Sequence, residues 1–133
     1  KPLFIASSIM RPIRRFLIAY DGKGSVRKAI DYITSQPLLK NGLECHLLVV
    51  ERTKGDIETV EAEQQLKQSG FQVILQTEES PHTDQVISSY VVEKQIDLLV
   101  TGAYSHSRMR SLLLGSTTAS LIKACKVPLL LFR

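Results

Sequence analysis

The stretch 101–122, TGAYSHSRMRSLLLGSTTASLI, places small, hydroxyl and basic residues between two apolar segments. Gly102 ends an aliphatic run, and Gly115 is followed by Ser116 and Thr117 where a helical pattern begins. The first N–H groups of a helix lack intrahelical partners and carry a partial positive charge, which suits a phosphate. The stretch therefore predicts either a phosphate-binding loop or an ordinary capped helix start.

A second candidate for binding chemistry is Asp21, which follows an apolar run and precedes Gly22 and Gly24. A carboxylate in this position can accept hydrogen bonds from a ribose hydroxyl or an adenine amine. It can also act as a turn or cap residue before the next helix, and the two roles are compatible. His106 is interpreted as a solvated loop histidine, because no positioned base or Gly-x-Ser-x-Gly motif accompanies it.

The elements that must position these residues can be read from five short apolar runs. Four of the runs are nearly continuous, which is typical of strands covered on both faces, whereas the third alternates and predicts an edge strand. The five predicted strands are 15–21, 44–51, 71–78, 97–103 and 127–133.

Helical patterns lie between the runs, beginning at Ser25, near Ile57, at Thr83 or Asp84, and at Gly115. Alternating strands and helices predict a doubly wound, five-stranded parallel sheet with helices on both faces. In such sheets ligands bind at the carboxyl ends of the strands, where the strand order reverses. We expect the residues that end the first and fourth strands to meet there.

The charge, the aromatic content and the length of the apolar runs indicate which kinds of partner to expect. The net charge is +4 and the pI is about 9.2, but the basic residues are scattered and aromatic residues make up 6%, so no nucleic-acid partner is expected. No apolar run approaches the roughly 20 residues that a membrane span needs. Cys45 and Cys125 fit no metal-binding spacing and are expected to be reduced thiols in a cytoplasmic protein.

The chain resembles the universal stress protein family from about Arg14 to Arg133. The resemblance lies in LIAYDGKGSVRKAID, HLLVVE and KVPLLLF, and in the spacing Gly102-x2-Ser105-x9-Gly115-Ser116. That spacing is in register with the motif Gly-x2-Gly-x9-Gly-Ser/Thr of the family's nucleotide-binding members. The resemblance implies an adenine nucleotide alpha hydrolase-like fold with strand order 3-2-1-4-5.

The resemblance also implies a function. We expect a stress-response domain that binds ATP or a related adenine nucleotide, alone or with Mg²⁺, and that is not an enzyme. The nucleotide-binding residues carried over by position are Ala19, Asp21, Val49, Thr101, Gly102, Ser105, Gly115, Ser116 and Thr117. Ser105 stands where the motif has its second glycine. Two alternatives therefore remain open, a nucleotide-free protein-interaction domain and a weak ATPase.

The ends of the chain carry further expectations. Residues 1–14 are expected to form a connector or arm, and residues 15–133 the α/β domain, as the C-terminal half of a tandem protein. The strand 127–133 is expected to pair with a second copy or with the other tandem half, because an apolar edge strand invites pairing. Alternatively, the apolar residues Leu3, Phe4 and Ile5 could add a strand to that edge or cover it.

Overall fold

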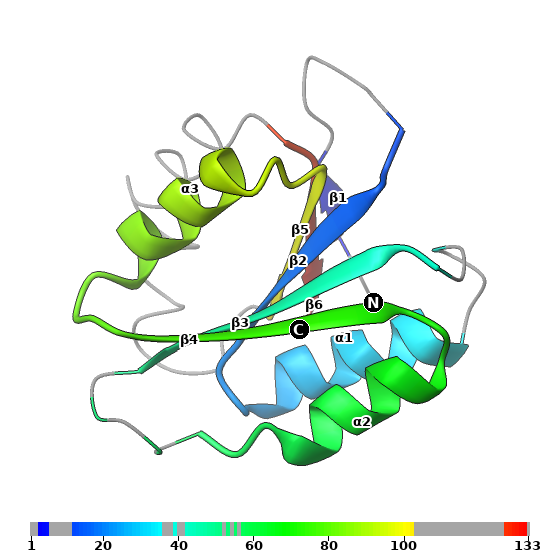
Figure 1. Cartoon of the computed structure of the whole chain (residues 1–133), viewed down its shortest axis with the longest axis horizontal. Helices are drawn as coiled ribbons and strands as arrows, with labels where there is room; N and C mark the ends of the chain where they lie inside the picture. Colours follow the sequence, from blue (N-terminus) through cyan, green and yellow to red (C-terminus); the bar gives the residue numbers. More distant parts are fainter. Residues whose placement is uncertain are drawn as a thin grey trace.

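The computed structural model describes residues 3–5, 12–35, 39, 42–51, 53, 55, 57–102 and 127–132. These residues form a single twisted sheet with helices on both of its faces (Figure 1). The predicted α/β class is therefore confirmed.

The five predicted strands form the parallel part of the sheet. Their order across the sheet is β4-β3-β2-β5-β6, which is the predicted order 3-2-1-4-5. The bounds are β2 Arg15–Tyr20, β3 Glu44–Glu51, β4 Gln72–Glu79, β5 Leu98–Gly102 and β6 Leu129–Phe132.

A sixth strand lies outside β6. This strand, β1 Leu3–Ile5, pairs antiparallel with β6, in contrast to the parallel pairing of the other strands. The alternative expectation that these apolar residues add a strand is confirmed, and the N-terminal arm is thus partly built into the sheet. The outer edge of β6, which was expected to pair with another copy, is occupied by β1 in this chain.

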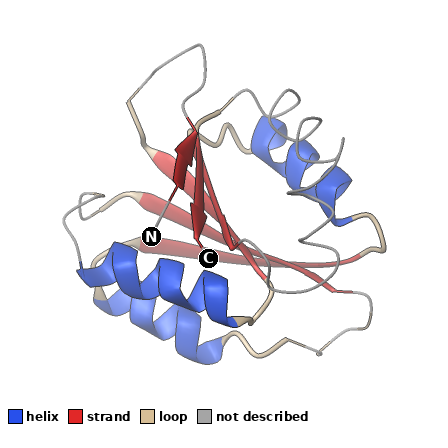
Figure 2. Ribbon diagram, turned by 180° about the vertical axis from the view of Figure 1, so that it is seen from behind, coloured by secondary structure: helices blue, strands red, loops and turns tan. Residues whose placement is uncertain are grey.

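Three helices are described. They are α1 Gly24–Ser35, α2 Val60–Gln68 and α3 Thr83–Glu93, close to the predicted starts. The helix expected from Gly115 lies outside the described residues. Helices α1 and α2 cover one face of the sheet and α3 covers the other, as Figure 2 shows from behind.

Two apolar layers result from this arrangement, because successive strand residues point to opposite faces. Phe16 and Ile18 pack in the layer beneath α1 and α2, and Leu17 packs in the layer beneath α3. The apolar spacing that predicted α1 is confirmed by its buried residues, which are Val26, Ala29, Ile30 and Ile33.

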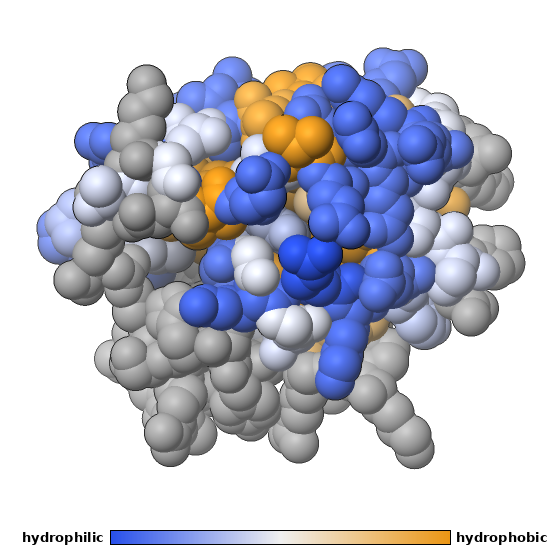
Figure 3. Space-filling view, turned by 90° about the horizontal axis from the view of Figure 1, so that it is seen from below, coloured by the Kyte–Doolittle hydropathy of each residue, from blue (hydrophilic) through white to orange (hydrophobic). Residues whose placement is uncertain are grey.

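Charged side chains lie on the edge strand β4 and on the outer side of α1 and α2. Strand β4, which was predicted to lie at an edge, does so, and it exposes Gln72, Glu78 and Glu79. The view from the side of α1 and α2 is mostly hydrophilic (Figure 3), and an ion pair of 3.5 Å joins Arg27 to Glu61 across these helices.

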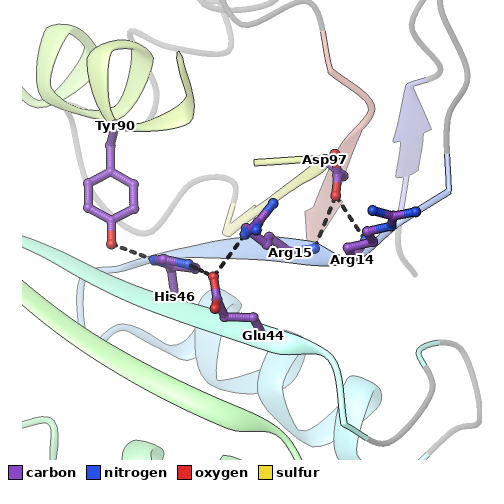
Figure 4. A network of polar contacts seen from close by, with 6 residues as sticks. All are labelled: Arg14, Arg15, Glu44, His46, Tyr90 and Asp97. Atoms are coloured by element: carbon purple, nitrogen blue, oxygen red, sulfur yellow. Dashed lines mark hydrogen bonds and ion pairs between the residues drawn. The ribbon is translucent and has the colours of Figure 1, made fainter. Parts of the chain in front are cut away.

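A polar network joins the amino-terminal ends of the strands to α3 (Figure 4). The Glu44 carboxylate lies 3.1 Å from Arg15 Nε and 2.6 Å from His46 Nε2. The other ring nitrogen of His46 lies 2.6 Å from the hydroxyl of Tyr90 on α3. Burial raises the pKa of Tyr90 to about 12, so this hydroxyl keeps its proton near neutral pH.

A second carboxylate at the same end aligns β2 with β5. Asp97 is buried, and its Oδ2 accepts hydrogen bonds from the backbone N–H groups of Arg14 at 2.8 Å and Arg15 at 3.1 Å (Figure 4). The starts of the two central strands are thereby held in register. Their carboxyl ends, 4–5 residues further along, consequently finish side by side.

We expect the Glu44 carboxylate to make stability depend on pH. The hydrogen bond with His46, aided by the charge of Arg15, holds the pKa of Glu44 below its ordinary value. Its contribution is therefore present above the unfolded pKa of about 4.3 and is lost as the pH falls through the lower folded pKa. In urea unfolding between pH 7 and pH 3, Glu44→Gln should flatten the acid side of the stability curve, and an unchanged slope would contradict this.

Candidate functional site

The candidate site lies where the strand order reverses. The chain leaves β2 toward β3 on one side, and β5 lies on the other side of β2. Asp21 follows directly after the last residue of β2, and Gly102 is the last residue of β5. The predicted meeting of these two strand ends is confirmed by the pairing of Ala19 with Thr101.

Asp21 forms the turn from β2 into α1. Its Oδ1 accepts a hydrogen bond of 2.9 Å from the backbone N–H of Lys23, as in an Asx turn. Gly22 has a φ of 76°, a backbone conformation that favours glycine. Asp21 is half-buried, and the turn role predicted from the sequence is present.

Gly102 is required for packing. A Cβ built on Gly102 would lie 2.8 Å from Ser25 Cβ and 2.8 Å from the backbone nitrogen of Val26. The sequence interpretation assigned this glycine to the close approach of a ligand. The first turn of α1 lies on the side where a Cβ would project, and contact of Gly102 with a ligand stays a prediction. Gly102 therefore brings the positive end of α1 against the end of β5.

Ala19 and Thr101 occupy paired positions on the α3 side of the sheet. Ala19 packs against the layer formed by Leu17 and Leu99, and the alternation along β5 places Thr101 on the same side as Leu99. Thr101 is buried, and its hydroxyl donates a weak hydrogen bond of 3.4 Å to the carbonyl of Gly102. These two candidate residues are thus brought together.

Val49 is placed differently from the other candidates. Its side chain is fully buried in the layer beneath α1 and α2, on the opposite face from Ala19. Val50 packs on the α3 side with Ala19 and is only partly buried. The pairing of β2 with β3 ends at Tyr20 and Val49, whereas β3 continues to Glu51, so the main chain of Val50 extends past the end of β2.

The remaining candidates belong to the segment after Gly102. Ser105, Gly115, Ser116 and Thr117 lie outside the described residues. They stay predictions from the motif spacing.

Glu51 is a positioning residue that the sequence reading missed. Its side chain is buried at the end of β3, where Oε2 accepts a hydrogen bond from the Gly55 N–H at 3.2 Å and Oε1 accepts one from the Ile57 N–H at 3.0 Å. Ile57 in turn lies 3.3 Å from the position that a Cβ on Gly22 would occupy. Glu51 therefore holds the loop after β3 against the Asp21 turn. The available signal was a carboxylate that closes the apolar run HLLVVE.

The described residues also form pockets away from this point, and they contain no cluster of metal-binding side chains. No group of three or more His, Cys, Asp or Glu side chains among them is placed to hold a metal ion. A pocket of about 190 Å³ between α1 and α2 is lined by Tyr20, Arg27 and Glu61 and lies on the opposite face from Ala19. A larger pocket, of about 470 Å³, lies at the amino-terminal ends of the strands, beside Arg14 and Asp97.

No helix in the described part of the chain has both the length and the apolar character needed to cross a membrane.

The fold and the position of the site define a class of protein. A parallel sheet of order 3-2-1-4-5 with helices on both faces is the adenine nucleotide alpha hydrolase-like fold. A sequence model of the universal stress protein family matches residues 12–133. The chain belongs to the universal stress protein family.

Individual relatives agree with this assignment. Universal stress protein Slr1230 of Synechocystis sp. is 33% identical over 137 residues, which cover 100% of this chain and 47% of that protein. A universal stress protein of Archaeoglobus fulgidus has a similar fold, with a TM-score of 0.74 at 22% identity over 98% of this chain and 48% of its own. The chain thus spans about half the length of these two relatives.

A second solved structure is closer to this chain in length. The hypothetical protein MJ0577 has a TM-score of 0.67 at 19% identity, covering 90% of this chain and 95% of its own. At this identity the likeness shows the fold alone.

Proposed function

We propose that this chain is a cytoplasmic stress-response domain that binds ATP or a related adenine nucleotide, without catalysing its turnover. The observation that carries the proposal is the placement of Asp21 beside the end of β5, at the reversal point of a doubly wound sheet. Ligands of such sheets bind in the crevice outside this point. The family membership and the motif spacing around Gly102 support the same ligand class.

The described residues fit the base and sugar of a nucleotide. The main chain of Val50 extends past the end of β2, where a backbone N–H and carbonyl can recognise the edge of a planar base. A carboxylate has several lone pairs, so Asp21 can accept a hydrogen bond from a ribose hydroxyl or a base amine in addition to the one from Lys23. The N-terminus of α1, held against Gly102, adds a favourable potential for an anionic ligand.

The residues expected to bind the phosphates belong to the part of the motif that lies outside the described residues. Ser105, Gly115, Ser116 and Thr117 would contact the phosphates, and a bound Mg²⁺ would accompany them as part of the ligand. The proposal therefore has two parts: base and sugar binding, which is supported by where Asp21 and Val50 lie, and phosphate binding, which is supported by the motif spacing.

We expect Asp21→Ala to weaken adenine nucleotide binding by about 1–3 kcal/mol, which corresponds to roughly 5–150-fold, because a partly buried acceptor is lost. Isothermal titration calorimetry with ATP, ADP and AMP measures the effect. Mass spectrometry of small molecules released from freshly purified protein identifies the natural ligand. Equal affinity of the variant and the parent would remove Asp21 from the site.

The matched control for this measurement is Asp31→Ala. Asp31 lies on the exposed side of α1, where its carboxylate accepts a hydrogen bond of 2.9 Å from Gln65. Both variants lose one negative charge, so a general electrostatic effect on an anionic ligand appears in both. A larger loss of nucleotide affinity in Asp21→Ala than in Asp31→Ala would therefore indicate a local role of Asp21 in binding.

The second candidate function is a nucleotide-free interaction domain, and Ser105 is the observation that favours it. If the glycine of the motif is needed at this position, Ser105→Gly should tighten nucleotide binding by relieving its steric cost. The same calorimetry decides between the two functions. Strong and equal binding by parent and variant shows that Ser105 is no impediment, whereas no binding by either supports the interaction domain.

A further inference from the structure

The pocket at the amino-terminal ends of the strands lies at the opposite end of the sheet from Asp21. Its volume is about 470 Å³, within the range of about 300–1,000 Å³ that is typical of small-molecule sites. It is lined by residues at the start of β2, at the C-terminal end of α3 and before β5 and β6. A ligand here would share no contact with a nucleotide at the carboxyl ends of β2 and β5, so the inference goes beyond the proposed function.

One wall of this pocket is apolar. Val91 and Ile96 are buried in it, whereas Val92 is 66% exposed, the largest exposed fraction among the large apolar side chains of the described residues. Pro12 and Val127 add apolar surface from two other segments. An aliphatic group placed in the pocket would remove this apolar surface from water.

Two guanidinium groups also line the pocket. The backbone N–H groups of Arg14 and Arg15 both donate to Asp97 Oδ2, which fixes the main chain from which the two side chains extend (Figure 4). The Nε of Arg15 is paired with Glu44 at 3.1 Å. Arg14 is exposed, and within the described part of the chain its guanidinium makes no ion pair. Arg14 can therefore pair with a carboxylate, whose two oxygens match the fork of a guanidinium.

The charges of the lining favour an anion. Asp97 is the acidic residue among the described lining residues, and its buried Oδ2 already accepts two backbone hydrogen bonds. Two cationic side chains therefore stand against one carboxylate whose charge is partly compensated.

Gln95 lines the same pocket in a backbone conformation that glutamine rarely adopts. Its φ is 54°, and its N–H donates to the carbonyl of Val92 while the N–H of Ile96 donates to the carbonyl of Val91. This is a Schellman motif, in which glycine usually stands at the position of Gln95. Strained residues of this kind cluster at functional sites. The glutamine adds what glycine lacks, a side-chain amide that can donate to an anion.

We infer that this pocket is a binding site for a small aliphatic carboxylate. The carboxylate pairs with the Arg14 guanidinium and accepts a hydrogen bond from the Gln95 amide. The aliphatic chain lies against Val91, Val92 and Ile96. A purely polar anion would leave the apolar wall in water, and a neutral aliphatic molecule would leave Arg14 unpaired, so the pocket should require both features in one ligand.

The first test uses octanoate as the probe, at concentrations below those at which it forms micelles. In NMR spectra of the isotope-labelled protein, we expect saturable shifts at the backbone amides of Gln95, Ile96 and Asp97. Affinity should rise from butanoate through hexanoate to octanoate, by up to about fourfold for each methylene that is buried. Acetate, which lacks the chain, and octanol, which lacks the charge, should each bind more weakly than octanoate.

The second test removes the cation. Arg14→Gln should weaken octanoate binding by about three- to fivefold, near the upper limit for an ion pair that stays exposed to solvent. The matched control is Arg27→Gln, which removes an arginine that pairs with Glu61 on the other face of the sheet and should leave the octanoate affinity unchanged.

The third test separates binding from stability. Gln95→Gly should raise the melting temperature, because glycine adopts a positive φ without strain, and should weaken octanoate binding, because the amide is lost. A residue with a structural role alone would change only the melting temperature. If octanoate binds the glycine variant as tightly as the parent, the contact with Gln95 is overturned.

Three results would overturn the proposal as a whole. They are the absence of saturable shifts at the pocket amides, equal affinity for octanoate and octanol, and equal losses of octanoate affinity in Arg14→Gln and Arg27→Gln. Both arginines are exposed, so neither variant is expected to impair folding.

Discussion

Replacing Glu51 with alanine is expected to lower the free energy of unfolding by about 2–3 kcal/mol, because two backbone N–H groups lose their charged acceptor. These groups belong to Gly55 and Ile57, which form the loop after β3. Chemical unfolding in urea measures the change. Glu51→Gln should recover part of the loss, since one amide oxygen still accepts while the NH₂ group faces a donor.

The matched control is Glu79→Ala. Glu79 pairs with Glu51 across β3 and β4 but is exposed, so removing its side chain should change stability by less than about 0.5 kcal/mol. If the two variants lose the same stability, the hydrogen bonds of Glu51 do not hold the loop. Nucleotide affinity provides a second measurement, because loosening Ile57 also removes the contact beside Gly22 and the Asp21 turn.

Gly102→Ala is expected to destabilise the domain by about 1–3 kcal/mol, the range for overpacking a tight interior. The added methyl would meet the backbone nitrogen of Val26 at 2.8 Å, and a backbone atom cannot move aside as the end of a flexible side chain can. Helix α1 must then shift away from β5. Thermal unfolding measures the loss, and nucleotide affinity should fall with it because the N-terminus of α1 leaves the strand end.

Gly24→Ala is the control for this variant. Gly24 begins α1, and a Cβ built there meets nothing within 4 Å. Alanine is favoured over glycine in a helix, so this variant should be as stable as the parent or slightly more stable. If Gly102→Ala loses no more stability than Gly24→Ala, the close contact between Gly102 and Val26 relaxes without destabilising the domain.

The strands and the layers of the fold could be predicted from hydrophobic spacing, whereas the strand order came from the family resemblance. The continuous runs identified the central strands, and the alternating run identified β4 as an edge. The periodic positions of α1 named its four buried residues. These features could be predicted because buried and exposed positions determine the order of apolar and polar residues in the sequence.

Contacts between residues far apart in the sequence could not be predicted from the order of apolar and polar residues. The sequence assigned Gly102 to ligand contact because glycine at a strand end permits any close approach, and only the structure shows that α1 is the neighbour. Val49 and Val50 are identical in type, so the face that each occupies depends on the register of β3. Glu51 was interpreted as the end of a strand. Its hydrogen-bond partners are the backbone N–H groups of Gly55 and Ile57, and residue types do not predict such a backbone contact.

The contrast between the two edges of the sheet has a consequence for assembly. One edge ends in β4, which exposes Ile74 and Leu75 but also the Glu78 and Glu79 carboxylates, and these carboxylates would repel the same residues of another copy. The opposite edge ends in β1, a strand of three residues, and a very short edge strand offers few backbone groups for pairing. Charge at one edge and a short strand at the other both oppose the open-ended addition of strands to which long, flat edges are prone.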